Sequence, residues 1–176
     1  MEYSTSEISS RFISAAYQLL EKIGEGGFGH VYKAKHVTTG QTVAIKFLTL
    51  SPEFDVEKKR RYIDRFERET ELVSRLKHPN VVRLLDKGRD DDERLYAVFE
   101  YVEGLTLKDM LRESGALSPI ETADVMAQLL DALVHAHEKG VIHRDLKPAN
   151  IMLSKIGAKI HAKILDFGIG SLTKEA

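Results

Sequence analysis

The sequence contains no cysteine among its 176 residues. Disulfide bonds, thiolate metal sites and a cysteine nucleophile are therefore excluded, and the composition fits a reducing compartment. A strong charge of one sign is also lacking, because 26 Lys and Arg residues nearly balance 27 Asp and Glu residues. The net charge of −1 gives no electrostatic reason to expect nucleic acid or an anionic membrane as the main partner.

Long apolar runs, internal repeats and linkers are lacking too. No stretch approaches the length of a transmembrane helix, and the polar, acidic start at 1–10 does not resemble a signal peptide. No Pro/Gly/Ser-rich or low-complexity segment divides the chain. We therefore expect a soluble, cytoplasmic chain with one substantial core and no membrane segment.

The order of the expected elements is a β-rich half followed by a helical half. Residues 1–16 form a short lead-in, with a turn or two of helix expected around Ile8, Phe12 and Ala15–Ala16. The pattern then predicts three strands between 17 and 47 and a helix over 53–77, ended by His78-Pro79. Two strands are expected at 81–85 and 95–101, joined by a charged turn at 88–94. Helices at 106–113 and 119–138 follow, and then short strands at 141–142, 151–153 and 162–165. This order indicates the α+β class, because strands and helices do not alternate.

A glycine-rich segment, Gly24 to Gly29, lies between the first two expected strands. Glycine lets backbone N–H groups approach phosphate oxygens without interference from a side chain. Glycine-rich hairpin turns are common, so this segment alone is a weak signal. A strand follows Gly29, which argues against a dinucleotide fingerprint, and no Gly-Lys-Ser/Thr completes a Walker loop.

Lys46 ends the otherwise apolar strand 43–46. One interpretation is a lysine that extends from a sheet edge into solvent, and the other is a cation held to pair with phosphates and a carboxylate. In the helix that follows, Glu69 shares a face with Phe66 and Val73, so its carboxylate points toward the core and needs a partner. Lys46 is the partner that we expect.

The segment His143 to Asn150, with the sequence HRDLKPAN, carries the most chemistry. Pro148 prevents a regular helix, so the side chains of Asp145, Lys147 and Asn150 can converge only in a loop. Asp145 is suited to accept a hydroxyl proton, Lys147 to hold a γ-phosphate, and Asn150 to bind a cation through its amide oxygen. Chance assembly of these residues at these offsets is very improbable.

A second carboxylate follows the strand expected at 162–165. Asp166 begins the sequence Asp166-Phe167-Gly168. A carboxylate at the end of a strand, beside Asn150, makes a hard oxygen site that suits Mg²⁺.

These four motifs occur in the same order as those of the eukaryotic-like Ser/Thr protein kinases, and the sequence resembles that family from Tyr17 to about Gly170. The run HAHEKGVIHRDLKPANIML looks most like the bacterial members. The resemblance implies a protein-kinase-like fold, with a complete N-terminal lobe of five antiparallel strands and one helix at 17–102 and an incomplete helical C-terminal lobe at 103–176. It also implies ATP and Mg²⁺ as cofactors and, through Lys147, a protein substrate phosphorylated on Ser or Thr.

The resemblance assigns a role to each matching residue. The residues implied to bind the nucleotide are Ile23, Gly24, Gly26, Gly29, Val31, Ala44, Lys46, Phe99, Glu100, Val102 and Met152. Phe99 would be the gatekeeper, and Glu100 and Val102 would offer backbone groups at the hinge.

The catalytic and metal-binding roles fall on fewer residues. The resemblance makes Asp145 the catalytic base beside Lys147, pairs Lys46 with Glu69, and gives Mg²⁺ to Asn150 and Asp166. A hydrophobic spine would consist of Val73, Leu84, His143 and Phe167.

The sequence departs from the family pattern where it ends, eight residues after Gly168. The activation loop, its anchor and several helices would follow that point, so Arg144 and Arg65 meet no phosphate of such a loop in this sequence. Ala149 places no carboxylate where kinases that prefer arginine-flanked sites often carry one. The basic run 58–61 fits a solvated helix start better than a docking patch.

Two interpretations remain open. In the first, the chain is the front portion of an active kinase, and in the second it is a nucleotide-binding pseudokinase or interaction module that transfers no phosphate. The presence of Lys46, Asp145, Asn150 and Asp166 favours the first for a longer protein. From the chain by itself we expect weak nucleotide binding and little or no activity.

The helix expected at 119–138 is apolar over much of its circumference. One broad face carries Val125, Leu129, Ala132, Leu133 and Ala136, and the neighbouring face carries Met126, Leu130 and Val134. We expect the chain to self-associate through this surface, most simply as a two-fold symmetric homodimer, or to rearrange its later half so that this helix packs elsewhere. The alternative is a monomer in which the loop at 143–150 and the strands near Ile151 and Ile164 cover the surface.

Overall fold

The computed structural model describes residues 12–13, 15–26, 29–157 and 159–167. These residues divide into two compact units, which are considered separately. The first unit extends to Thr70 and resumes at Leu84–Tyr101, and the second consists of Glu71–Arg83 together with the described residues from Val102 to Phe167. The segment 71–83 thus groups with the later half of the chain.

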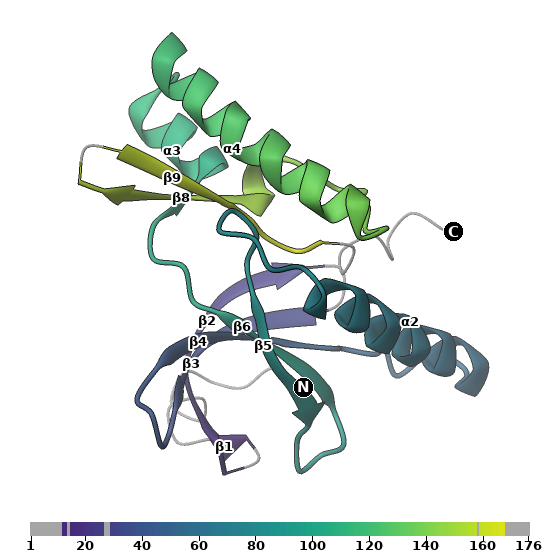
Figure 1. The fold of residues 1–176 in the computed structure, drawn as a ribbon. Coiled ribbons are helices and arrows are strands. Elements are labelled where there is room, and N and C mark those ends of the chain that lie inside the picture. Colours follow the sequence, from purple (N-terminus) through teal and green to yellow (C-terminus); the bar gives the residue numbers. More distant parts are fainter. Residues whose placement is uncertain (1–11, 14, 27–28, 158, 168–176) are drawn as a thin grey trace. The chain divides into compact units, whose positions relative to one another are not determined.

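The first unit is built on one antiparallel sheet with the strand order β1-β2-β3-β4-β6-β5 (Figure 1). Its strands are β1 (Phe12–Ile13), β2 (Tyr17–Gly26), β3 (Gly29–His36), β4 (Thr42–Phe47), β5 (Leu84–Arg89) and β6 (Leu95–Glu100). The five strands expected from the sequence are present, and the two-residue β1 adds a sixth at the edge.

The start of the described chain differs from the sequence-based expectation. Phe12 and Ile13 pair with Gln18 and Tyr17 of β2, so the helical turn expected around Phe12 and Ala15–Ala16 is wrong. The physical reason is burial, because Ile13 is fully buried as a strand residue in the core of the unit. Ala15, with φ of 54°, makes the turn from β1 into β2. Ile8 lies outside the described residues.

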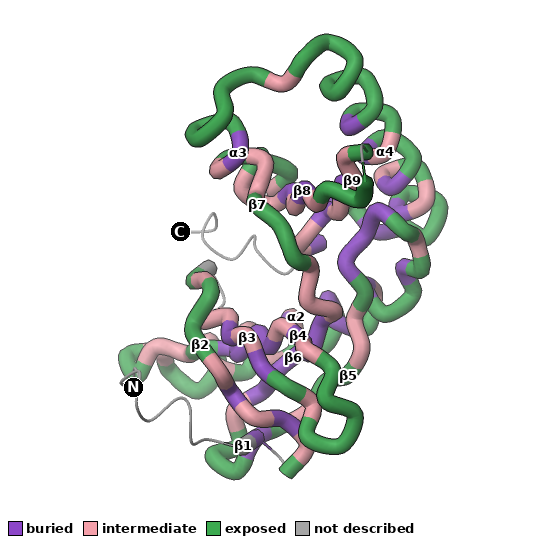
Figure 2. The backbone as a smooth tube through the Cα atoms, turned by 90° about the vertical axis from the view of Figure 1, so that its left-hand side faces the viewer, coloured by how far each residue is buried: buried purple, intermediate pink, exposed green. Residues whose placement is uncertain are grey.

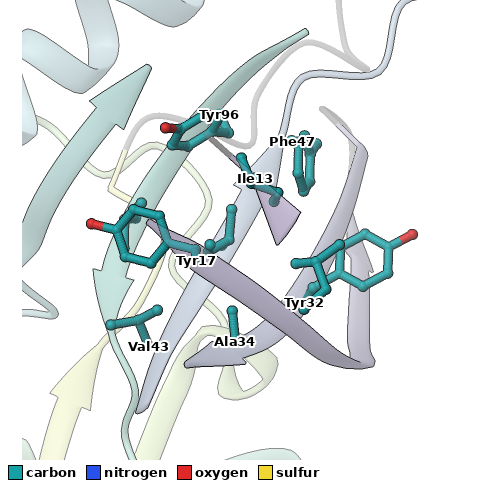
Figure 3. Close-up of a cluster of buried hydrophobic side chains, with 10 residues drawn as sticks. Ile13, Tyr17, Tyr32, Ala34, Val43, Phe47 and Tyr96 are labelled. Atoms are coloured by element: carbon teal, nitrogen blue, oxygen red, sulfur yellow. The ribbon is translucent and has the colours of Figure 1, made fainter. Parts of the chain in front are cut away.

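One face of the sheet carries the apolar core of the first unit (Figure 3). Alternate residues of a strand point to opposite faces, so Val43, Ile45 and Phe47 of β4 enter the same cluster. The remaining buried members come from the neighbouring strands: Ile13, Tyr17, Leu19, Tyr32, Ala34, Tyr96 and Val98. Ala44 and Lys46 therefore belong to the opposite face.

Helix α2 (Val56–Ser74) lies within the range expected from periodicity. Asp55 caps its start, because the Asp55 Oδ1 atom accepts the Lys58 N–H at 2.7 Å. Phe66, Glu69 and Val73 are all buried, which confirms the shared face inferred from their spacing.

Strand β5 begins later than the strand expected at 81–85. It covers Leu84–Arg89, and Val81 instead forms a parallel bridge with Ile164. The backbone around 80–82 is used by the edge of another strand, which is why it does not join β5.

The second unit combines a small antiparallel sheet, β7-β8-β9, with two helices. Its elements are β7 (Leu105–Thr106), α3 (Leu107–Ser114), α4 (Pro119–Glu138), a single 3-10 turn η1 (Pro148–Asn150), β8 (Ile151–Ile156) and β9 (Lys159–Ile164). Helix α4 runs along the β8–β9 hairpin and contacts β9 (Figure 1).

The ends of α4 follow the sequence signals. Ser118 and Glu121 form a reciprocal capping box at the start, and Pro119 occupies the first turn. At the other end Gly140, with φ of 73°, lets its own N–H bond to His137 O and the Val141 N–H bond to Ala136 O. Because Val141 completes this helix end, the short strand expected at 141–142 does not form.

The two faces of α4 have different surroundings. Val125, Leu129, Ala132 and Ala136 are buried, whereas Met126, Leu130 and Val134 are 48%, 56% and 56% exposed. Figure 2 shows the resulting alternation of buried and exposed positions along this helix. The strands do cover the first face, as the alternative interpretation of the sequence allowed, and leave the second open. Among the described helices, none combines the length and the apolar character needed to cross a bilayer.

Candidate active site

The glycine-rich segment forms the end of the β2–β3 hairpin. Gly24 pairs with Val31 and Gly26 pairs with Gly29, so the segment lies between two strands as expected, and residues 27–28 at its tip lie outside the described residues. Gly29 has φ of +143°, and a Cβ atom there would lie 2.5 Å from the Phe47 carbonyl oxygen. Only glycine fits this position, because a side chain would meet the backbone of β4.

Strand register brings several of the nucleotide-binding candidates onto one face of the sheet. Lys46 pairs with Val31 on one side and with Ala97 on the other, and directly paired residues share a face. Ala44 pairs with Phe99 in the next row. This face is the one opposite the apolar cluster, and the Lys46 side chain on it is only 2% exposed.

Glu69 is buried on α2, in the same unit as Lys46. Its Oε1 atom forms an ion pair with Arg65 Nε at 2.9 Å. Arg65 therefore pairs with a carboxylate one helical turn away. The Lys46–Glu69 pair stays a prediction.

In the second unit, His143 anchors the loop at 143–150. Its ring is buried, its Nε2 atom lies 2.7 Å from Leu165 O, and its Nδ1 atom accepts the Asp145 N–H at 3.3 Å. A nitrogen facing a carbonyl must carry hydrogen, so these partners define a neutral ring protonated at Nε2. Burial lowers the pKa of His143, which agrees with the neutral form.

Asp145, Lys147 and Asn150 converge as the sequence predicted. Lys147 Nζ lies 2.6 Å from Asp145 Oδ2, and Asn150 Nδ2 donates to Asp145 O at 2.8 Å. The hydrogen bond from Lys147 lowers the pKa of Asp145, so the carboxylate stays ionised and able to accept a proton. Arg144 adopts a left-handed conformation, with φ of 63°, that turns the chain between His143 and Asp145.

The hairpin of β8 and β9 brings Asn150 and Asp166 to neighbouring positions. Ile151 pairs with Ile164, and the Leu165 N–H donates to Asn150 O at 2.8 Å, so Asn150 lies opposite Leu165 and Asp166 is the next residue along the chain. Because the Asn150 side-chain nitrogen donates to Asp145 O, the side-chain oxygen of Asn150 points away from that bond.

This donor set fits Mg²⁺. The described residues contain no group of three His, Cys, Asp or Glu side chains able to hold a metal ion. Mg²⁺ is commonly held by one or two protein oxygens together with substrate phosphates and water, so an amide and a carboxylate suffice when a nucleotide is present.

The other nucleotide-binding candidates are divided between the two units. Ile23 is 44% exposed on β2, and Glu100 ends β6 beside Val43. Val102 and Met152 belong to the second unit, where Met152 pairs with Lys163. Their contacts with a nucleotide stay predictions. Of the expected spine, the His143 and Phe167 rings are in contact with centroids 4.9 Å apart, Val73 is buried and Leu84 is half-buried.

Sequence reasoning missed two residues, Asn80 and Gln128. Asn80 is 6% exposed, and its Nδ2 atom donates to Gln128 Oε1 at 2.8 Å and to Ala162 O at 2.7 Å. A signal existed, because Gln128 is a polar residue between Val125 and Leu129 on the apolar face of α4. Both residues act on the strand that leads to Asp166.

Comparison with known proteins adds a family to this geometry. A profile of the protein kinase domain matches residues 17–176. The chain is 42% identical over 159 residues to the serine/threonine-protein kinase PrkC of Bacillus subtilis, which covers 90% of this chain and 23% of that protein. It is 38% identical over 165 residues to the serine/threonine-protein kinase pkn2 of Myxococcus xanthus, and this match covers 94% of this chain and 19% of that protein. It is also 38% identical over 175 residues to the serine/threonine-protein kinase PkaA of Streptomyces coelicolor, and this match covers 92% of this chain and 31% of that protein. The chain thus spans less than a third of the length of these relatives.

Proposed function

The chain belongs to the protein kinase domain family, and from this premise we propose that it supports transfer of the ATP γ-phosphoryl group to Ser or Thr hydroxyls of a protein substrate. The observation that carries the proposal is the convergence of Asp145, Lys147 and Asn150 in one loop. A carboxylate with a lowered pKa, beside a lysine that can neutralise a phosphate, is suited to this reaction.

Each residue of the loop has a defined part in the proposal. Asp145 orients the substrate hydroxyl and accepts its proton, and Lys147 lies against the transferred phosphate. Asn150 and Asp166 would hold Mg²⁺, which when bound neutralises charge on the phosphates. His143 keeps the loop in place through its bonds to Leu165 and to the backbone of Asp145.

The first unit supplies the remaining groups for the nucleotide. Lys46 would bind the α- and β-phosphates, and the hairpin of Gly24, Gly26 and Gly29 would cover them with backbone N–H groups. Ile23, Val31, Ala44 and Met152 would contact the adenine, and Phe99, Glu100 and Val102 would define its inner wall and hinge contacts. We also propose that the reaction takes place in the cytoplasm, because it requires ATP and free Mg²⁺.

Phosphoryl transfer can be measured directly with γ-labelled ATP and peptides that differ only in carrying Ser, Thr or Tyr. The chain and versions extended from its gene are compared in Mg²⁺ and in Mn²⁺. Label on Ser and Thr but not on Tyr supports the proposal. Nucleotide binding with no transfer by any version would favour the pseudokinase instead.

We also propose a homodimer formed through the exposed stripe of Met126, Leu130 and Val134 on α4. An apolar stripe on a straight helix can pair with its own copy across a two-fold axis. Leu129 on the first face is buried within its own unit and only 3% exposed, so Leu130→Glu is the appropriate variant. Light scattering at micromolar concentration should show a dimer for wild type and a monomer for Leu130→Glu, and a monomeric wild type would refute the dimer.

A further inference from the structure

The outer edge of β9, on the side away from β8, is bonded by side-chain amides. Gln128 Oε1 accepts the Ala162 N–H at 2.9 Å, and Gln128 Nε2 donates to Ile160 O at 2.9 Å. The carboxamide therefore takes the place that a peptide group of a neighbouring strand would occupy.

Asn80 continues the same edge toward Asp166. Its side chain donates to Ala162 O, its backbone oxygen accepts the Ile164 N–H at 2.8 Å, and the Val82 N–H donates to Ile164 O at 2.9 Å. From Ile160 to Ile164 the outward backbone groups of β9 are thus bonded without another full strand.

The segment that carries Asn80 is itself fixed to α4. His78 Nε2 lies 3.1 Å from Asp131 Oδ2, and the Lys77 N–H donates to His135 Nε2 at 3.4 Å. Gln128, Asp131 and His135 are spaced i, i+3 and i+7, so they form one polar stripe on the helix. This stripe, together with Asn80, clamps β9 along its outer edge.

The clamp acts on the candidate metal site because β9 leads directly to it. Leu165 follows the strand and bonds to Asn150 and His143, and Asp166 comes next. Asp166 has φ of 54°, a left-handed conformation that a non-glycine residue keeps only where its surroundings hold it. Movement of β9 would therefore displace Asp166, which is joined to the strand through Leu165 alone.

We propose that Gln128 and Asn80 are positioning residues for Asp166, and that they determine how tightly this site holds Mg²⁺ in the presence of nucleotide. The inference rests on the proposed function, because it assigns Mg²⁺ to Asn150 and Asp166. Neither Gln128 nor Asn80 touches the reacting atoms. Mutation of residues that hydrogen-bond to metal ligands and orient them commonly weakens metal binding.

The test compares Gln128→Met with Leu129→Ala in the 176-residue chain. Methionine keeps the length of the glutamine side chain and removes all of its hydrogen bonds to β9. Leu129→Ala removes buried contacts from the neighbouring position of the same helix and leaves the polar stripe intact. Temperatures are chosen so that both variants are equally folded.

Two readouts are required. The first is the Mg²⁺ concentration that gives half-maximal binding of a fluorescent ATP analogue, which we expect to rise about tenfold in Gln128→Met and to stay near wild type in Leu129→Ala. The second is hydrogen exchange at the Ala162, Ile164 and Leu165 amides, which should be faster in Gln128→Met than in Leu129→Ala. The exchange readout does not depend on nucleotide.

Each outcome decides one of the two proposals. Equal Mg²⁺ dependence in the two variants would overturn the positioning role, and equal exchange at these three amides would overturn the clamp itself. A wild-type chain that binds no nucleotide at any Mg²⁺ concentration would instead refute the proposed function, and exchange would still decide the clamp. If Gln128→Met does not fold, Gln128→Glu replaces it, because a carboxylate keeps the acceptor bonds and removes only the bond to Ile160 O.

Discussion

The two units hold their functional side chains by different means. In the first unit Val31, Lys46 and Ala97 lie side by side because of strand register, so regular backbone pairing alone aligns them. In the second unit Asp145 and Asp166 lie in segments without regular pairing, held by side-chain hydrogen bonds and by left-handed backbone. Substitutions of the paired backbone positions in the first unit should therefore act mainly through backbone fit, and those of the polar loop residues in the second mainly through chemistry.

Asp145→Asn tests the chemical half of this comparison and should have the largest effect. Asparagine keeps the shape of the side chain but cannot accept the substrate proton, so in a version extended from the gene the rate of phosphoryl transfer should fall by about 10²–10⁴-fold. Nucleotide affinity should change little. A variant with undiminished transfer would remove Asp145 from the role of base.

Gly29→Ala tests the backbone half, with Gly24→Ala as its matched control. The new Cβ at 29 would meet Phe47 O in a conformation that alanine rarely adopts, so the free energy of unfolding should fall by about 3 kcal/mol. At Gly24 the nearest atom is 3.8 Å away, and the change should stay within about 1 kcal/mol. Equal losses in urea denaturation would show that strand fit does not distinguish the two glycines.

His143 should make the stability of the second unit depend on pH. Its pKa is lowered in the folded state, so the unfolded chain binds a proton at higher pH than the folded chain does. Stability should therefore fall as the pH drops below about 6.5, the ordinary histidine value. Urea titrations of wild type and His143→Phe between about pH 7 and 5 measure this dependence, and the variant should show the shallower slope. Equal slopes would assign the acid sensitivity to other groups.

Leu130→Glu should have the smallest effect on folding. The side chain is 56% exposed, so the free energy of unfolding should change by no more than about 0.5 kcal/mol. Leu129→Glu, one residue earlier, would place a charge in a buried position and should destabilise the unit strongly. Similar melting temperatures for the two variants would contradict the assignment of buried and exposed faces on α4.

Sequence periodicity predicted the regular elements well because each depends on local signals. The caps at Ser118 and Gly140 define α4, and the alternation in β4 predicts its two faces. Pro148 and the spacing of the polar residues were enough to predict the loop at 143–150. The bond from this loop to Leu165 could not be predicted in this way, because it joins segments that are distant in sequence.

The errors have the same origin. Val81 was assigned to a strand from local composition, but its backbone pairs with Ile164, far along the chain. Phe12–Ile13 was expected in a helical lead-in, but the core gains a buried Ile13 when these residues pair with β2. The sequence shows Gln128 as a polar residue on the apolar face of α4 but does not show its partners on β9, which lie more than thirty residues away. Local patterns do not encode such long-range partners.

The most direct test of the account is calorimetric titration of ATP with and without Mg²⁺ into wild type, Lys46→Met and Asp166→Asn, with Lys35→Met as an exposed-lysine control on β3. We expect Mg²⁺-dependent binding by wild type and by Lys35→Met. Lys46→Met should weaken binding with and without Mg²⁺, whereas Asp166→Asn should weaken chiefly the Mg²⁺-dependent part. Equal, Mg²⁺-independent binding by all four proteins would contradict the assignment of Lys46 and Asp166 to one nucleotide site.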